Sequence, residues 1–145
     1  MSAPLRLLFV CVENSCRSQM AEAFARTLGG ARVEAYSAGS RPSGAVNPRA
    51  IASMRDAGLD LSTHASKSLQ DVAGPGAPAF DVVVTMGCGD ACPWVPAARR
   101  EDWSIPDPKA LEPAEFARVR DQIEARVRAL LATCGVPAAD ARVAE

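Results

Sequence analysis

The sequence contains little of what would indicate a metalloprotein, a nucleic-acid-binding protein or a membrane protein. His64 is the only histidine among 145 residues, so a zinc site would depend mostly on sulfur ligands. The net charge of −1 gives no indication of a nucleic-acid or membrane partner. No apolar run approaches the roughly 18 residues of a membrane-spanning helix. With 48% hydrophobic and 23% charged residues, the chain has the composition of an ordinary soluble protein, long enough for one domain with a substantial core.

The first residues lack the charged region and long apolar region of a signal peptide, and we therefore expect a cytoplasmic protein. Without such a signal, an odd number of cysteines argues against a framework of structural disulfides and favours reactive or metal-binding thiols. The five cysteines are Cys11, Cys16, Cys88, Cys92 and Cys134.

The stretch from residue 5 to residue 28 organises the chain. Leu5 to Val10 are mostly apolar and predict a buried strand. Ser18 to Leu28 carry apolar residues at helical spacing and are followed by two glycines, which predicts a helix and its end. Between them, Cys11 is followed by five residues and then by Arg17.

This spacing suits an oxyanion site. A tight loop between a strand and a helix turns successive backbone N–H groups inward, and the helix dipole adds positive potential. Arg17 can hold an oxyanion through two parallel hydrogen bonds, and the same field favours the thiolate of Cys11 at neutral pH. A thiolate beneath a tetrahedral oxyanion is a nucleophile placed to attack phosphorus or arsenic. The expected oxyanion-binding residues are Val12, Glu13, Asn14, Ser15, Cys16, Arg17 and Ser18, and the last could donate a hydrogen bond to the thiolate. The alternative is that Cys11 is simply a buried cysteine at the end of a strand.

The rest of the chain alternates between expected strands and helices. Strands are expected at 32–36, followed by a turn at 37–39, and at 81–86. Helices are expected at 48–58 and 112–131. The remaining segments are expected to be a short strand or loop at 66–69, turns at 73–78 and an extended segment at 103–108. This alternation predicts an α/β protein with a parallel sheet. Functional loops of such sheets lie beyond the carboxyl ends of the strands, which places Cys11, Cys88 and Cys92 at one edge.

Several motifs together resemble the thioredoxin-coupled arsenate reductases, which share the fold of the low-molecular-weight tyrosine phosphatases. The motifs are Cys11-Val-Glu-Asn-Ser-Cys-Arg-Ser-Gln-Met-Ala-Glu22, Ser37-Ala-Gly39, Val46-Asn-Pro48, Thr85-Met-Gly-Cys-Gly-Asp-Ala-Cys-Pro93 and Asp107-Pro108. The resemblance implies a four-stranded parallel sheet flanked by helices, in a single domain spanning residues 1–145 with a frayed tail from about residue 138.

The resemblance also implies a relay of three cysteines with no bound cofactor. Cys11 attacks arsenate, and Asp107 protonates the leaving oxygen. Cys88 then attacks Cys11 and releases arsenite, and Cys92 attacks Cys88 to form a second disulfide that thioredoxin reduces. Gly87 and Gly89 give the backbone around Cys88 the freedom that thiol–disulfide exchange needs.

Other assignments of these residues stay open. Cys88 and Cys92 could be half of a zinc site, although no second pair accompanies them. Asp107 alone could be a turn residue before proline. We expect Cys16 to pack beneath the loop, and Cys134 and His64 to have no catalytic part.

The chain also departs from some members of the family. Glu13 replaces a glycine, and we expect its carboxylate to face solvent, where it would not repel an oxyanion. Some members bind a structural potassium ion where this chain has Lys67, whose ammonium could pair with Glu22; we predict no potassium dependence. The short spacing between Cys88 and Cys92 leaves their order of attack open, and mycothiol or glutaredoxin-like systems remain possible reductants.

Two other functions compete with arsenate reduction. A tyrosine phosphatase would use Cys11, Arg17 and Asp107 without the redox pair, but Tyr36 is the only tyrosine and none follows Asp107-Pro108 to hold an aromatic substrate. We expect weak phosphatase activity as a by-product, with phosphate and sulfate as competing anions. A non-enzymatic metal- or arsenic-binding protein would use the thiols as soft ligands, but would have no need of an anion loop.

We expect the protein to be a monomer.

Overall fold

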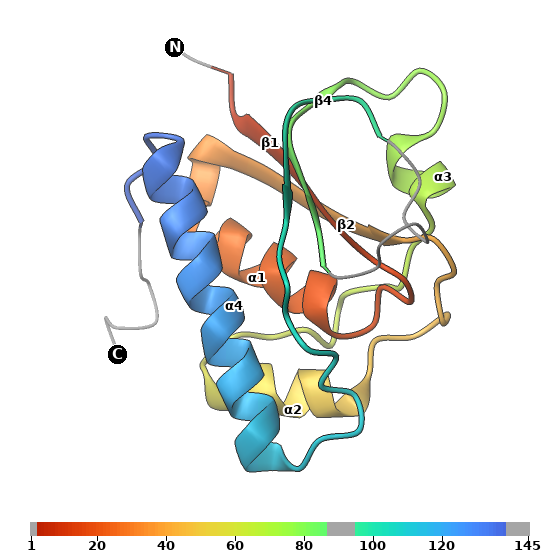
Figure 1. Ribbon diagram of the computed structural model, residues 1–145, viewed down its shortest axis with the longest axis vertical. Coiled ribbons are helices and arrows are strands. Elements are labelled where there is room, and N and C mark those ends of the chain that lie inside the picture. Colours follow the sequence, from red (N-terminus) through yellow and green to blue (C-terminus); the bar gives the residue numbers. More distant parts are fainter. Residues whose placement is uncertain (1–2, 87–94, 139–145) are drawn as a thin grey trace.

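Four parallel strands form the centre of the fold, in the order β2-β1-β3-β4 (Figure 1). The computed structural model describes residues 3–86 and 95–138, so Cys88, Cys92 and, apart from residue 138, the tail expected from about residue 138 lie outside the described residues. The strands are β1 (Leu5–Cys11), β2 (Val33–Gly39), β3 (Phe80–Thr85) and β4 (Ala97–Asp102). The predicted four-stranded parallel sheet is therefore confirmed.

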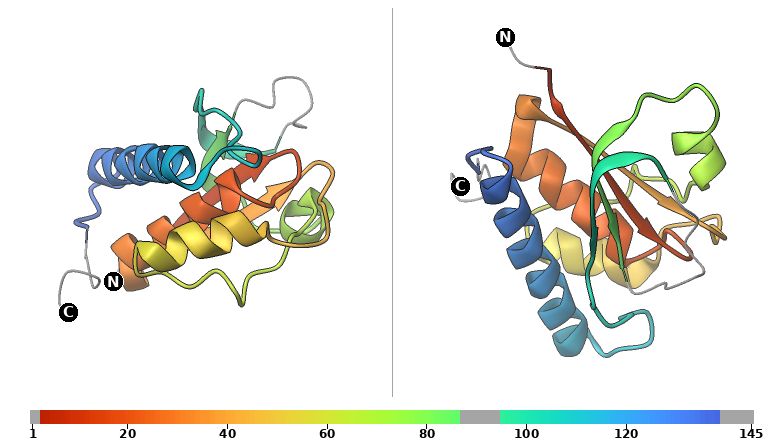
Figure 2. Two further views of the ribbon diagram at one scale, coloured as in Figure 1. Left: turned by 90° about the horizontal axis from the view of Figure 1, so that it is seen from below. Right: turned by 45° about the horizontal axis from the view of Figure 1, so that its top comes forward.

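Helices cover both faces of this sheet. They are α1 (Arg17–Gly29), α2 (Pro48–Asp56), α3 (Leu69–Ala73) and α4 (Pro113–Thr133), with the short 3-10 helix η1 (Gly30–Arg32) between α1 and β2. Figure 2 shows α4 lying alongside α1, and α4 also contacts α2. Within residues 3–86 and 95–138, no helix has the length and apolar character needed to cross a membrane.

Strand β1 divides the core because its side chains alternate between the two faces. Leu7 and Phe9 belong to the larger cluster, which includes the buried side chains of α1, α2 and α4. Leu8 and Val10 belong to a smaller cluster, against which α3 packs. Burial on both faces explains why β1 reads as a nearly continuous apolar run.

The long C-terminal helix has the buried face expected from the sequence. Its buried residues are Phe116, Val119, Ile123, Val127, Leu130 and Leu131. The helix ends at Thr133, and Gly135 just beyond it has a φ of 76°, the left-handed conformation that often follows a helix end.

Three local predictions were incomplete or wrong. The expected turn at residues 37–39 is instead the end of β2, because Ser37 to Gly39 pair in register with the end of β1. The segment expected as a short strand or loop at 66–69 makes one bridge, between Gly39 and Ser68, and leads into α3, whose capping box is formed by Ser68 and Asp71. Strand β4 was not located, because its sequence Ala-Ala-Arg-Arg-Glu-Asp has no apolar alternation and lies at the edge of the sheet.

Candidate active site

The loop between Cys11 and Arg17 is held by hydrogen bonds to its carbonyl oxygens. Neighbouring segments donate to these carbonyls at 2.8–3.1 Å, through Arg41 N, Ser43 N, Asn47 N, Ser66 Oγ and Gln19 Nε2; the acceptors are Val12, Glu13, Asn14 and Ser15. No peptide is cis among the described residues, and in a trans peptide the N–H points away from the preceding carbonyl. The N–H groups of residues 13–16 are therefore directed to the inner side of the loop. Asn14 has a φ of 51°, the left-handed conformation that occurs in anion nests.

Gly39, at the end of β2, allows this loop to approach the sheet. A Cβ at Gly39 would lie 2.5 Å from the carbonyl oxygen of Val12 and 3.0 Å from the N of Asn14. Any side chain there would push the loop outward. The Ser37-Ala-Gly39 motif thus has a steric role at the base of the loop.

Cys11 lies at the carboxyl end of β1, where its side chain is buried and its Sγ is 2.9 Å from Ser18 Oγ. The direction of this hydrogen bond follows from the partners of Asn14. Gln19 Nε2 and Lys67 N both donate to Asn14 Oδ1, at 2.9 and 2.7 Å. Asn14 Nδ2 then donates to Ser18 Oγ at 2.8 Å, so the hydroxyl proton of Ser18 is left for Cys11 Sγ. This is the hydrogen bond expected from the sequence.

A second layer supports this chain of hydrogen bonds. Gln19 is fully buried, and its Oε1 lies 3.0 Å from His64 Nδ1, which must donate because an amide oxygen accepts. Burial lowers the pKa of His64 below its usual value, and the carboxylate of Glu22 opposes that shift. His64 is therefore connected to Cys11 by hydrogen bonds that pass through Gln19, Asn14 and Ser18.

Arg17 is the first residue of α1, and two carbonyl oxygens from other segments fix its guanidinium. Its Nη1 donates to Met86 O at 2.6 Å and to Ile105 O at 2.9 Å. Its Nη2 lies 4.0 Å from Asp107 Oδ2, with the Arg17 side chain 12% exposed and that of Asp107 43% exposed. The guanidinium is thus held in place with donors remaining for an anion.

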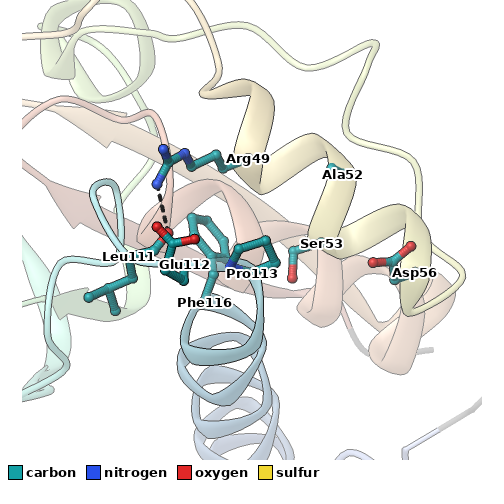
Figure 3. A pocket seen from close by; sticks show the side chains of 8 residues that line it. All are labelled: Arg49, Ala52, Ser53, Asp56, Leu111, Glu112, Pro113 and Phe116. Carbon is teal, nitrogen blue, oxygen red and sulfur yellow. Dashed lines mark hydrogen bonds between the residues drawn. The ribbon is translucent and has the colours of Figure 1, made fainter.

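The loop, Arg17 and Asp107 enclose a small cavity of about 90 Å³. It is lined by Cys11, Val12, Glu13, Ser15, Cys16, Arg17 and Asp107. A larger cavity of about 340 Å³ lies between α2 and the start of α4 (Figure 3). Most of the surface that lines it is apolar, and none of its lining residues carries a thiol. Only the smaller of these two cavities brings together a thiol, inward N–H groups, a guanidinium and a carboxyl group.

Cys16 also lines the small cavity but differs from Cys11 in its chemistry. Burial raises the pKa of the Cys16 thiol to about 12, despite the hydrogen bond from Ser15 that opposes the shift. At neutral pH this group is a thiol, which is a poor nucleophile. Cys16 was expected to pack beneath the loop; it is buried, but it also lines the cavity.

Glu13 lines the small cavity, and its carboxylate pairs with the segment that carries Asp107. Its Oε2 lies 2.8 Å from Lys109 Nζ, and the two side chains are 40% and 48% exposed. The carboxylate is thus neutralised by a partner as well as solvated, and no local sequence pattern indicates that partner.

The surroundings of Glu22 do not fit a potassium site. Glu22 is buried, and its carboxylate accepts a hydrogen bond from Ser37 Oγ at 2.5 Å and pairs with Arg26 Nη2 at 2.8 Å. Lys67 Nζ lies 3.6 Å from Glu22 Oε1 and donates to Ala65 O at 3.0 Å. A potassium ion at this position would be repelled by the positive charges of Arg26 and Lys67. In the part of the chain that the structure describes, no group of three or more His, Cys, Asp or Glu residues is placed to hold a metal ion.

Comparisons with known proteins define the family. A family model for low molecular weight phosphotyrosine protein phosphatases matches residues 6–137, and the chain belongs to this family. A glutaredoxin arsenate reductase of Synechocystis sp. is 41% identical over 130 residues, covering 88% of this chain and 96% of that protein. The resemblance to arsenate reductases expected from the sequence is confirmed.

Solved structures give the same result for the fold. An arsenate reductase in the phosphate binding state matches with a TM-score of 0.79 and 39% identity, covering 89% of this chain and 98% of that one. A thioredoxin-dependent arsenate reductase of Corynebacterium glutamicum matches with a TM-score of 0.72 and 32% identity, covering 92% of this chain and 63% of that one.

Sequence reasoning named the residues around the cavity but not those that hold them. It placed Cys11, Arg17, Ser18 and Asp107 in one site, and the structure brings these four together. It missed the part of Gln19, a polar residue in the first turn of α1 that is fully buried. It also missed the carbonyls of Met86 and Ile105, which no side-chain pattern reveals.

Proposed function

We propose that this protein reduces arsenate to arsenite, with Cys11 as the nucleophile. The observation that carries the proposal is the position of Cys11 Sγ, which lies 2.9 Å from the Ser18 hydroxyl in a cavity that Arg17 also lines. The N–H groups of residues 13–16 and Arg17 would bind the arsenate oxygens. The names of the relatives support arsenate as the oxyanion.

The first step is formation of a bond between sulfur and arsenic. The Cys11 thiolate attacks arsenate, and one arsenate oxygen leaves as water after receiving a proton. Asp107 is the group proposed to donate this proton, since it lines the cavity with a half-exposed carboxyl group.

The second step is the reduction. A Cys88 thiolate attacks Cys11 Sγ, a disulfide forms, and the electron pair of the S–As bond stays on arsenic, which leaves as arsenite. Cys92 then attacks the Cys88 sulfur, so that Cys11 departs as a thiolate and the Cys88–Cys92 disulfide remains. Both residues lie outside the described residues, so their part rests on the resemblance and on the chemistry of thiol–disulfide exchange.

Thioredoxin is the proposed reductant of the final disulfide. The thioredoxin-dependent relative supports this choice, whereas the Synechocystis relative is called a glutaredoxin enzyme. Mycothiol and glutathione systems are therefore the next reductants to test. We further propose a cytoplasmic monomer without a bound cofactor.

A phosphatase is the second candidate, since the family model carries that description and phosphate resembles arsenate in shape and charge. Against it, Tyr36 is the only tyrosine, and it packs against Phe80 with ring centroids 5.9 Å apart, without lining the small cavity. Weak phosphatase activity remains part of the proposal as a by-product.

The proposal is tested by following NADPH oxidation with thioredoxin and thioredoxin reductase, with and without arsenate. We expect arsenate-dependent oxidation that is lost in Cys11→Ser, Cys88→Ser and Cys92→Ser. Cys134→Ser is the matched control, because Cys134 lies at the end of α4 and outside the cavity. Hydrolysis of p-nitrophenyl phosphate without arsenate-dependent oxidation, after the other thiol systems have also been tried, would favour the phosphatase.

A further inference from the structure

One ion pair connects the two segments that face each other across the small cavity. Glu13 belongs to the anion loop and Lys109 follows Asp107 by two residues, and their charged atoms are 2.8 Å apart across a separation of 96 residues. Both Glu13 and Asp107 line the cavity. The pair therefore joins one wall of the cavity to the segment that forms the other.

The same lysine also contacts Asp107 itself. Lys109 N donates to Asp107 Oδ1 at 3.2 Å, so the residue that reaches Glu13 is fixed in the turn that carries this carboxyl group. Leu111 N donates to Pro108 O at 2.9 Å, which closes the turn. At its far end, Arg49 Nη1 donates to Leu111 O at 2.7 Å, the bond drawn as a dashed line in Figure 3.

The turn is thus held on two sides. Arg49 attaches it to α2, and Lys109 attaches it to the anion loop. With both attachments made, the turn stays close to the loop, and the cavity between them is only about 90 Å³.

We propose that the Glu13–Lys109 ion pair closes the gap between the anion loop and the turn, and that it thereby selects free inorganic oxyanions over organic phosphate esters. This closed ion pair is called the bar below. A free tetrahedral oxyanion can bind inside the loop with the bar closed. An ester with an aromatic group must pass that group between the loop and the turn, which requires the pair to open. The inference rests on the proposed function, and it supplies a reason why a chain with the phosphatase fold would favour an inorganic substrate.

A purely electrostatic role for the two residues makes a different prediction. If the charges acted only through their field on an anion, removing Glu13 would strengthen anion binding and removing Lys109 would weaken it. The bar is instead broken by either substitution. Both substitutions then change the selectivity between inorganic oxyanions and organic esters in the same direction.

The test compares the binding of inorganic phosphate with that of benzylphosphonate, which does not hydrolyse, by titration calorimetry on the full chain. We expect Glu13→Gln and Lys109→Gln each to raise the affinity ratio of benzylphosphonate to phosphate by about two- to fivefold, the range expected for an exposed ion pair. The exchanged pair, Glu13→Lys with Lys109→Glu, restores the wild-type ratio. Glu124→Gln is the matched control, because it breaks an ion pair with Arg128 on α4, away from the cavity.

The proposal is overturned if the two single variants change the ratio in opposite directions, if neither changes it, or if the exchanged pair does not restore it. The measurement uses neither arsenate nor a reductant. A chain without arsenate reductase activity could still show the bar, and an active reductase could lack it, so the two failures are distinguishable.

Discussion

Ser18 Oγ lies 2.9 Å from Cys11 Sγ and accepts a hydrogen bond from Asn14 Nδ2 at 2.8 Å. Since Asn14 Oδ1 already accepts from two N–H groups, the amide of Asn14 cannot be reversed without losing both bonds. The Ser18 hydroxyl therefore has one direction in which to donate, toward the sulfur. A serine in this position stabilises negative charge on Cys11.

Replacing Ser18 with alanine should make Cys11 less reactive. Hydrogen bonds to charged groups contribute about 1.5–3 kcal/mol, so we expect alkylation of Cys11 by iodoacetamide at pH 7 to slow by roughly tenfold or more in Ser18→Ala. Mass spectrometry of the modified peptide measures the rate. Ser62→Ala is the control, because Ser62 is exposed and bonds to Asp60. An unchanged alkylation rate would show that the hydroxyl does not act on the sulfur.

Arg17→Lys should weaken oxyanion binding although the charge is kept. A lysine cannot donate to the carbonyls of Met86 and Ile105 and to an anion in the same planar arrangement. We expect the dissociation constant for phosphate to rise by about tenfold or more, because charge-assisted bidentate hydrogen bonds are lost. Calorimetry measures this constant, and Arg118→Lys on the exposed side of α4 is the control. Equal affinity in Arg17→Lys would mean that only the charge matters.

Potassium should have no specific effect on this protein. Lys67 and Arg26 already lie next to the Glu22 carboxylate, so a further cation gains little there. We expect equal melting temperatures and equal activity in sodium and potassium buffers of the same ionic strength. A severalfold rise in activity on replacing sodium by potassium would contradict this account of Lys67.

His64 should make the protein less stable at mildly acidic pH. Burial lowers the pKa of His64 in the folded state, so the unfolded chain binds more protons as the pH falls below about 6.5. The stabilising contribution is therefore complete above that pH and is lost progressively below it. We expect the free energy of unfolding in urea to fall more steeply between pH 7 and pH 5 in the wild type than in His64→Gln, whose amide can still donate to Gln19. The same slope in both proteins would exclude a contribution from His64.

The local parts of the site could be predicted from the sequence, because the eight residues from Cys11 to Ser18, where β1 ends and α1 begins, contain most of the chemistry. Cys11, Arg17 and Ser18 are close in sequence, and the surrounding apolar pattern determines β1 and α1. The turn expected at residues 37–39 was wrong because strand pairing with β1 overrides the local preference of a Ser-Ala-Gly segment.

The parts that could not be predicted depend on long-range contacts or weak local patterns. Lys109 reaches Glu13 across 96 residues, and the carbonyls that hold Arg17 come from the segments that follow β3 and β4. Helix α3 has only five residues, too few for a periodic pattern, and β4 is a polar edge strand. Each of these features is set by tertiary packing rather than by local sequence.

The most direct test of the central claim is a single turnover without any external reductant. Reduced protein is mixed with arsenate under anaerobic conditions, and arsenite, free thiols and disulfides are then quantified. We predict one arsenite and two lost thiols per chain, with a Cys88–Cys92 disulfide in the wild type and a Cys11–Cys88 disulfide in Cys92→Ser. Absence of arsenite, with all thiols still free in a protein that binds phosphate, would contradict arsenate reduction by this chain.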